Sequence, residues 1–471
     1  MNLTVTATLS TMVHSLQSGV RFRAEPTAAQ AQVLARWIGC QRVIYNAKVE
    51  EDRLFAAQRR MLLRQDPAAS VRTPLDSSYS QFKDDELTPW LSEVPSVVLR
   101  QAVCRWRDAK QRQLQGLAKA PRRRSRHNFY TVRLDADAFK AEEVVDADGV
   151  VRIALFLGTK SKPLGELKFR AHRPHGVPKM LTIGRQAGRW YVSFSYEHAA
   201  PEDFVPRTPS ELAYELDLLD DEALRGATLG LDRNVKHNAV ALSDGRFFMP
   251  GAVELERLRR KEVGARRHQR RLARQQKGSA NRAKTQARLA RKQHYRQRVL
   301  LDFTHKTSHA IATSDALVVG VEKLQVANMT ARPKARQDET GRWLRNGAAQ
   351  KAGLNKAILQ RGWGRVLQQL TYKLARRNKL LVEVSPRHTS QQCSRCGHTA
   401  PDNRQDERFV CHACGYAAHA DLNAAQNIRM RAIARIRSGE LQVQRKPGQR
   451  VAIRHKNSSG PGRPAVPVEH S

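Results

Sequence analysis

The chain has 471 residues, and its 83 lysines and arginines against 44 acids give a formal net charge of +39. In a compact protein with this net charge, the positive side chains repel one another strongly. A polyanion that neutralises them is therefore the expected partner, and nucleic acid is the simplest choice. No stretch approaches about 18 consecutive apolar residues, which excludes a membrane-spanning helix. The N-terminus also lacks the basic flank and apolar core of a signal peptide, so a cytoplasmic protein is expected.

The N-terminal part begins without a clear pattern. We expect residues 1–19 to be disordered or to include a wrongly assigned start, because Met12 is an alternative first residue. A short strand is expected over residues 20–24. Thr27 followed by Gln30 is a capping box, which predicts that a helix begins there.

A second helix is expected from about residue 95 to 117, before the chain changes to short runs typical of strands. These runs lie between residues 131 and 197, and Gly188 predicts a tight hairpin between the last two. The expectation for residues 20–200 is an antiparallel β-barrel or sheet with a helical insertion at about 27–120. The acidic, turn-rich residues 201–225 are expected to form a linker.

The C-terminal half is predicted to be a second domain of strands and helices. Three strands come first, with Asp244-Gly245 as the hairpin turn before the third. Further strands are expected at 316–321 and 380–384, and a last helix at about 422–437. This order of elements is that of an RNase H-like core. The segment 438–471 is rich in Pro, Gly and Ser, which predicts a disordered tail.

Residues 257–298 are strongly basic, with seventeen lysines and arginines and one acid, Glu262. Gly278-Ser279 divides them into two predicted helices whose charges recur on more than one face. Phosphate binding is therefore favoured over a solvated helix. A smaller basic run stands before Phe129 and Tyr130, where RNA binding and an ordinary basic loop are equally good interpretations. The candidate nucleic-acid-binding residues are Arg122, Arg123, Arg124, Arg126, Arg266, Arg267, Arg270, Arg271, Arg274 and Lys277.

Four of the six cysteines form two Cys-x-x-Cys-Gly motifs, Cys393 with Cys396 and Cys411 with Cys414. Each motif presents two thiolates on one turn, and two such turns complete a tetrahedral Zn²⁺ site. Four thiolates leave no open coordination position, so the predicted zinc is structural. The alternative is a redox dithiol pair, which does not require the duplication.

Three acids stand at the ends of predicted elements: Asp232 and Glu322 end strands, and Asp421 begins the last helix. In an RNase H-like core, carboxylates at adjacent strand ends converge and bind Mg²⁺, because they cannot all ionise cheaply without cations. Two such ions hold the attacking water and the leaving oxygen of a phosphoryl displacement. Taken singly, each acid is more commonly a turn or capping residue.

The same residues carry a family resemblance. Residues 228–245, TLGLDRNVKHNAVALSDG, resemble the first RuvC motif of TnpB proteins, the RNA-guided nucleases encoded by insertion sequences and ancestral to type V CRISPR effectors. Residues 318–324, VVGVEKL, resemble the second motif. Residues 389–428, from TSQQC to CGYAAHADLNAAQNI, resemble the zinc ribbon and the third motif. The resemblance extends over roughly residues 20–437.

The resemblance implies an α/β multidomain protein. A wedge β-barrel with an inserted helical recognition lobe would precede a RuvC nuclease domain at 226–437, with a zinc ribbon inserted at 388–417. It implies that Asp232, Glu322 and Asp421 are catalytic and bind two Mg²⁺ ions. The implied activity is hydrolysis of double-stranded target DNA beside a short flanking motif, directed by a guide RNA. A prokaryotic, cytoplasmic monomer bound to its RNA is expected.

Two positions depart from the family pattern. Asn234 and Asn378 stand where glycine is common, and since asparagine tolerates left-handed backbone geometry, both turns should survive. Two other functions stay open. An RNA-guided repressor without cleavage is possible in this family, although the intact acids argue against it. A DNA transposase would need a duplex-binding domain, and no helix-turn-helix signal stands out.

Overall fold

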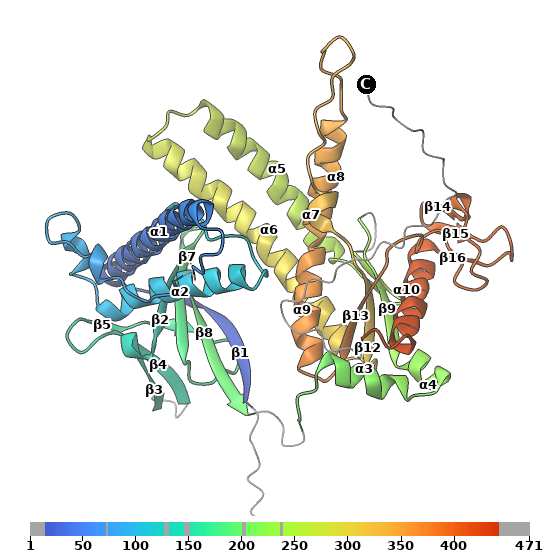
Figure 1. Cartoon of the computed structure of the whole chain (residues 1–471), viewed down its shortest axis with the longest axis horizontal. Coiled ribbons are helices and arrows are strands. Elements are labelled where there is room, and N and C mark those ends of the chain that lie inside the picture. Colours follow the sequence, from blue (N-terminus) through green and yellow to red (C-terminus); the bar gives the residue numbers. More distant parts are fainter. Residues whose placement is uncertain are drawn as a thin grey trace, which may run out of the picture.

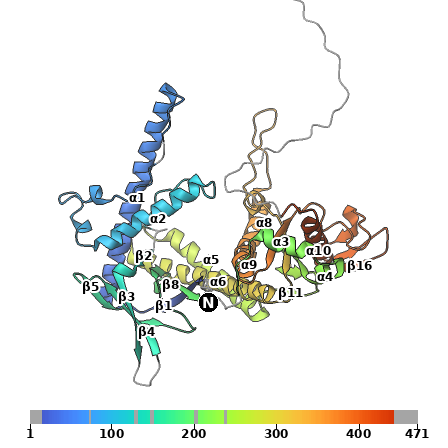
Figure 2. The ribbon, with the colours of Figure 1, turned by 60° about the horizontal axis from the view of Figure 1, so that its bottom comes forward.

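The computed structural model describes residues 15–71, 74–126, 131–145, 151–199, 204–235 and 239–441. The expectations for residues 1–14, for the alternative start at Met12 and for the tail from residue 442 onward lie outside the described residues. The described chain forms two lobes, seen side by side in Figures 1 and 2, and one long helix contacts both.

The N-terminal lobe is built on antiparallel sheets, as predicted. One has the strand order β2-β7-β8-β1-β6 and the other the order β3-β4-β5. The first strand begins at Ser15, before the predicted residue 20, because it pairs with β8 along its whole length. The predicted hairpin between β7 and β8 is confirmed, with Gly188 at a φ of +81°. The strands are β1 (Ser15–Ala24), β2 (Thr131–Asp135), β3 (Phe139–Val145), β4 (Val151–Gly158), β5 (Pro163–Glu166), β6 (Phe169–Arg170), β7 (Met180–Gln186) and β8 (Arg189–Ala199).

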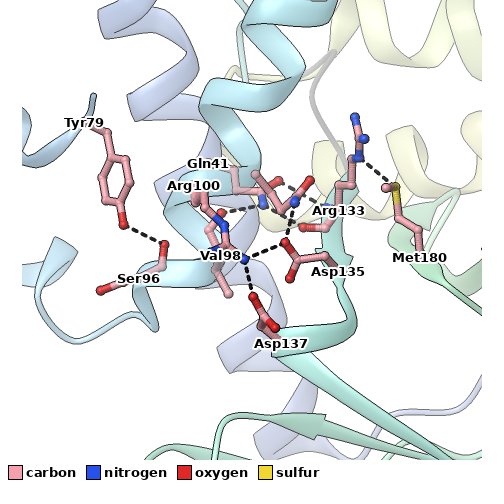
Figure 3. Close-up of polar contacts among 10 residues, drawn as sticks. Gln41, Tyr79, Ser96, Val98, Arg100, Arg133, Asp135, Asp137 and Met180 are labelled. Atoms are coloured by element: carbon pink, nitrogen blue, oxygen red, sulfur yellow. Dashed lines mark hydrogen bonds and ion pairs between the residues drawn. The ribbon is translucent and has the colours of Figure 1, made fainter. Parts of the chain in front are cut away.

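Two helices pack on this lobe, α1 (Ala28–Gln65) and α2 (Ser96–Leu114). The capping box at the start of α1 is confirmed, since Thr27 and Gln30 each bond the other's backbone. Gln41 fixes α1 in place, because its side-chain amide donates to Val98 O at 2.7 Å and to Arg133 O at 2.8 Å (Figure 3). Both N–H groups of this buried amide are satisfied, one by α2 and one by β2. The amide therefore fixes the positions of α1, α2 and β2 relative to one another.

The C-terminal lobe has a five-stranded sheet in the order β11-β10-β9-β12-β13. The first three strands are antiparallel, and β9, β12 and β13 run parallel, which is the topology predicted for an RNase H-like core. Helices cover both faces of the sheet, α9 with the end of α6 (Ala280–Ala312) on one and α10 on the other. The elements are β9 (Thr228–Asp232), β10 (Val240–Leu242), β11 (Phe247–Phe248), β12 (Val318–Glu322), β13 (Leu380–Val384), α9 (Trp363–Ala375) and α10 (Ala420–Arg437).

The expected linker at 201–225 is wrong over most of its length, because it contains two helices. These are α3 (Pro209–Asp217) and α4 (Asp221–Gly226). A capping box at Thr208 starts α3, and its leucines pack against α10 and β13. The acidic composition suggested solvent exposure, but an amphipathic helix needs only one apolar face.

Gly362 separates two helices in this lobe. It has a φ of +71° and lies close to Leu300 and Thr304 of α6. The helix before it is α8 (Ala348–Arg361), and a short α7 (Val326–Met329) precedes α8. A left-handed glycine ends one helix and starts the next at a new angle.

The basic segment forms the two helices predicted for it, α5 (Ala252–Arg274) and α6 (Ala280–Ala312), with Ser279 capping the second. They lie against each other as a hairpin that extends from the C-terminal lobe toward the N-terminal one (Figure 1). Gln297 of α6 accepts a hydrogen bond from Gln186 of β7 at 3.2 Å. In the described part of the chain, no helix has the length and apolar character needed to cross a membrane.

Candidate active site and cysteine cluster

Strand pairing brings two of the predicted acids to one edge of the sheet. β9 and β12 are parallel, with Leu231 opposite Val321, so Asp232 and Glu322 follow at adjacent strand ends. Both acids are buried, at 8% and 7% exposure. This arrangement follows from the topology, because parallel strands end at the same edge.

The third acid, Asp421, lies in the first turn of α10 and is fully buried. His419 starts this helix, since its Nδ1 accepts the backbone N–H of Asp421 at 3.2 Å. The helix packs directly on the sheet because β9 carries Gly230, where a Cβ would lie 1.9 Å from Ala425 O. The absence of that Cβ lets α10 lie across β9 and brings Asp421 toward the strand end.

Polar contacts hold two of the three carboxylates. Asn234 donates to Asp421 Oδ2 at 2.6 Å, and Arg404 donates to Asp421 Oδ1 at 3.2 Å. Thr389 donates to Glu322 Oε1 at 2.6 Å. Both carboxylates are thus held in fixed orientations by donors from other segments of the chain.

Asp232 stands in an unfavourable environment for its charge. Burial, together with repulsion from Glu322 and Asp421, raises the pKa of Asp232 to about 7. Desolvation and neighbouring like charges both favour the neutral carboxyl. A perturbed acid beside two others is typical of a functional site.

The carboxylates do not converge as closely as the cysteines do. In the parts of the chain that the structure describes, the four cysteines are the group of metal-binding side chains whose ligand atoms all lie within 4.8 Å of one another. The three acids share one edge without meeting that limit. The donors Asn234 and Arg404 already occupy the carboxylate of Asp421.

The sequence did not point to the donors of this site. Asn234 was expected to be tolerated in place of glycine; its φ is not positive, and its side chain contacts Asp421. Asn378 has a φ of 51°, which is the left-handed geometry that asparagine tolerates. Arg404 and Thr389 lie far from the acids in sequence, and only the fold brings them there. For Asn234, the available signal was its position two residues after Asp232 in the segment 228–245.

The four cysteines form a compact cluster. Sγ of Cys393 lies 3.8 Å from that of Cys414, and Sγ of Cys396 lies 3.6 Å from that of Cys411. Four sulfurs placed about 2.3 Å from a central zinc ion, at tetrahedral corners, would lie about 3.8 Å apart. The observed spacing therefore fits a four-coordinate ion, and all six cysteines are free of disulfides.

Each pair of cysteines sits on the same type of turn. Gly397 N–H donates to Cys393 O, and Gly415 N–H donates to Cys411 O, both at 2.9 Å. Both glycines have positive φ, +78° and +70°, a backbone geometry that glycine adopts without steric cost.

A small sheet links the cysteine cluster to Asp421. It has the order β14-β15-β16, and α10 follows β16 directly. Asn423 in α10 accepts from Ser394 N at 2.9 Å and donates to Gln392 O at 2.8 Å. The strands are β14 (Arg404–Gln405), β15 (Arg408–Val410) and β16 (Ala417–His419). The turn that carries Cys393 and Cys396 is thus bonded to the helix that carries Asp421.

The predicted nucleic-acid-binding residues lie in two separate places. The first set is on the loop after α2, where Asn46 of α1 exchanges two backbone hydrogen bonds with Arg124. The side chains are exposed, and Arg123 pairs with Glu50 at 3.4 Å. Phe129 and Tyr130 lie outside the described residues. The first set comprises Arg122, Arg123, Arg124 and Arg126.

The second set lies on α5 and on the turn that follows it. No residue of α5 is buried, and each predicted cation there is exposed. Arg266 contacts Glu262 at 3.4 Å. Such a helix presents charge to solvent on every side that α6 leaves uncovered. The second set comprises Arg266, Arg267, Arg270, Arg271, Arg274 and Lys277.

Three family models match the chain. The model described as "Probable transposase" matches residues 207–332, and "Cas12f1-like, TNB domain" matches residues 363–428. A third, described as "Helix-turn-helix domain", matches residues 12–52. In this structure the described residues of that segment form strand β1 and the first part of the uninterrupted helix α1. The matched segment therefore has no turn between two helices here.

Two similar proteins cover most of the chain. One, "Putative RNA-guided DNA endonuclease InsQ" of Escherichia coli strain K12, is 29% identical over 89% of this chain and 94% of its own. The other, "Putative RNA-guided DNA endonuclease" of Streptomyces pristinaespiralis, is 28% identical over 91% of this chain and 92% of its own. A solved Cas12f1 complex with sgRNA and target DNA covers 88% of this chain and 99% of its own, at 11% identity and a TM-score of 0.46.

The matches agree with the motifs quoted from the sequence. The two longest model matches together contain all three acids and all four clustered cysteines. These similarities agree with the resemblance to TnpB proteins that the sequence motifs indicated.

Proposed function

We propose that this protein is an RNA-guided DNA endonuclease encoded by a transposable element, which hydrolyses target DNA beside a short flanking motif. The observation that carries the proposal is the placement of Asp232, Glu322 and Asp421 at one edge of an RNase H-like sheet. It is supported by relatives that carry this activity in their names and match about nine-tenths of the chain.

The donor set fits divalent magnesium. Carboxylate oxygens are the protein ligands that Mg²⁺ prefers. Burial and then the charges of Glu322 and Asp421 raise the pKa of Asp232, and a cation would relieve the repulsion among the three carboxylates. We propose that Asp232, Glu322 and Asp421 hold two ions. When bound, the ions would supply charge stabilisation for phosphoryl displacement.

The chain's own residues would order and insulate this site. Thr389 and Asn234 fix the carboxylates of Glu322 and Asp421, so little side-chain freedom is lost when substrate binds. Glu322 is proposed to help position the attacking water. Arg404 provides a cation beside Asp421 at the same edge.

We further propose that the cysteine cluster is a structural zinc ribbon and that the N-terminal lobe is a wedge domain with a helical recognition insert. The ribbon's spacing supports zinc, and the antiparallel strands of the N-terminal lobe support the wedge assignment. Guide RNA and target DNA are the proposed partners of the exposed cations on α5 and on the loop after α2. A monomer on its RNA is the proposed assembly.

The test is guided cleavage by the chain purified with its own RNA. Asp232→Ala should abolish cutting of a matched plasmid in Mg²⁺ while RNA binding stays within about twofold. Asp85→Ala, which removes an exposed acid from the N-terminal lobe, is the matched control. Guided cutting by Asp232→Ala at the wild-type rate would refute the assignment. If the wild type binds matched DNA without cutting it, the protein is instead an RNA-guided repressor.

A further inference from the structure

One segment outside the site has an unusual surface for a structural loop. The Trp343 hairpin, defined as residues 330–347, connects α7 to α8 and stands away from the body of the C-terminal lobe in both ribbon views (Figures 1 and 2). Trp343 is 67% exposed. The other five tryptophans of the chain are buried or half-buried. An exposed tryptophan offers a ring face on which a nucleic-acid base can stack.

The hairpin has a defined shape. Gln337 and Trp343 form a β-bridge, and Leu344 N–H donates to Arg336 O at 2.9 Å. At its tip, Asp338 Oδ1 accepts from Thr340 N at 3.0 Å and from Arg342 N at 2.9 Å. The turn therefore holds Trp343 in its exposed position before any ligand binds. Little conformational entropy would be lost when a ligand does bind.

Charge indicates what the hairpin would bind. It carries five exposed cations and two acids, one of which is the turn-forming Asp338. Within the described residues, none of the five cations takes part in an ion pair. A surface with one exposed indole among unpaired cations complements a strand of phosphates with accessible bases. The five cations are Arg332, Lys334, Arg336, Arg342 and Arg345.

We propose that the Trp343 hairpin binds an unpaired nucleic-acid strand, with the indole stacked on a base and the flanking cations on its phosphates. A duplex would not serve, because its bases are already stacked and an aromatic ring cannot reach their faces. The hairpin follows β12 and Glu322 in the chain, so a strand held there would be tethered to the lobe that carries the acids. This proposal rests on the proposed function for the source of the strand, but its chemistry needs only single-stranded polynucleotide.

The test measures strand binding without cleavage. The full chain, in EDTA, is titrated with oligothymidylate, with oligouridylate and with a duplex of equal length. Trp343→Ala should weaken single-strand binding about 5- to 150-fold, the range for loss of one stacked base, and leave duplex binding unchanged. Trp343→Phe should keep most of the affinity. Leu87→Ala, which removes another exposed apolar side chain, is the control and should have no effect.

A local probe separates this contact from the many other cations. Strands carrying 5-iodouracil should photocrosslink to Trp343, and the crosslink should disappear in Trp343→Ala. The thymidylate and uridylate arms show whether the strand is DNA, RNA or either. Unchanged single-strand affinity in Trp343→Ala, or equal loss for duplex, would overturn the proposal. Because this test measures no cutting, the Trp343 proposal can fail while Asp232-dependent cleavage is observed. Cleavage can likewise fail while Trp343 is found to bind a single strand.

Discussion

Arg404 reaches from the small sheet beside the cysteines to Asp421, donating to its Oδ1 at 3.2 Å. The carboxylate is fully buried, and the arginine side chain is about one quarter exposed. The cysteine-bearing segment therefore contributes a charge directly to the candidate active site.

Arg404→Ala should change how the site responds to Mg²⁺. Removing a cation from beside Asp421 leaves more negative charge, so the Mg²⁺ concentration that gives half-maximal cleavage should fall several-fold. The maximal rate should also fall, by about 5- to 30-fold, because the carboxylate loses a charge-assisted hydrogen bond that orients it. Initial cleavage rates across a Mg²⁺ titration measure both effects. Arg395→Ala, an exposed arginine of the same segment, should behave as wild type; a higher Mg²⁺ requirement in Arg404→Ala would contradict the prediction.

Gly230→Ala should destabilise the C-terminal lobe. A Cβ at this position would lie 1.9 Å from Ala425 O, so α10 would have to move away from β9 and take Asp421 with it. Overpacking of this kind costs about 1–3 kcal/mol and can cost more. Urea unfolding measures the loss, and guided cleavage should fall with it. Gly353→Ala in α8 is the matched control, because nothing lies within 4 Å of its Cβ position and alanine favours a helix. Equal stability of the two variants would count against the packing argument.

Cys393→Ser should remove bound zinc and lower stability. We expect one zinc ion per chain in the wild type and less in the variant, since a serine hydroxyl is a poor fourth ligand. The thermal midpoint should fall, because metal binding and folding of such segments are coupled. Zinc content and the melting temperature are the measurements. Cys104→Ser, which lies outside the cluster, should keep its zinc. An unchanged melting temperature after complete zinc removal would rule out a structural ion.

Asp232 should make the metal-free protein sensitive to pH. Burial and the charges of Glu322 and Asp421 raise its pKa to about 7, so the folded state holds the proton more tightly than the unfolded state does. This contribution to stability is fully present below about pH 4 and is lost as pH rises through 7. Compared with Asp232→Asn, the wild type should lose up to about 4 kcal/mol across that window. Urea unfolding in EDTA at several pH values tests this, with Asp85→Asn as control. A constant difference between wild type and Asp232→Asn at all pH values would show that the carboxyl does not titrate in this window.

The sequence was sufficient for the strands that carry the acids. Asp232 and Glu322 stand at the ends of apolar runs, and a parallel pair of strands has to bring such ends together. The cysteine turns were likewise predictable, since each is complete within five residues. For the cysteine turns the information is local. For the two acids, the sequence pattern gives the strands and the parallel topology brings their ends together.

The contacts around the acids could not be predicted in the same way. Arg404 contacts Asp421 only because β14 pairs with β15 in a sheet that packs against α10, and no local pattern encodes that distance. The helices α3 and α4 were missed because their acidic composition concealed a few leucines on one face. Exposure of Trp343 also depends on what the fold leaves uncovered, and the sequence alone does not show this.

Helix α6 has 33 residues, which corresponds to a rod of about 50 Å. Near its middle, His294 lies edge-to-face with Tyr191 of β8, and toward its end Ser308 donates to the buried Gln369 of α9. The last turn of α6 packs on the sheet through Ile311 and Ala312, beside the strands that end in Asp232 and Glu322. One continuous helix therefore connects the N-terminal lobe to the face of the sheet beneath the candidate active site.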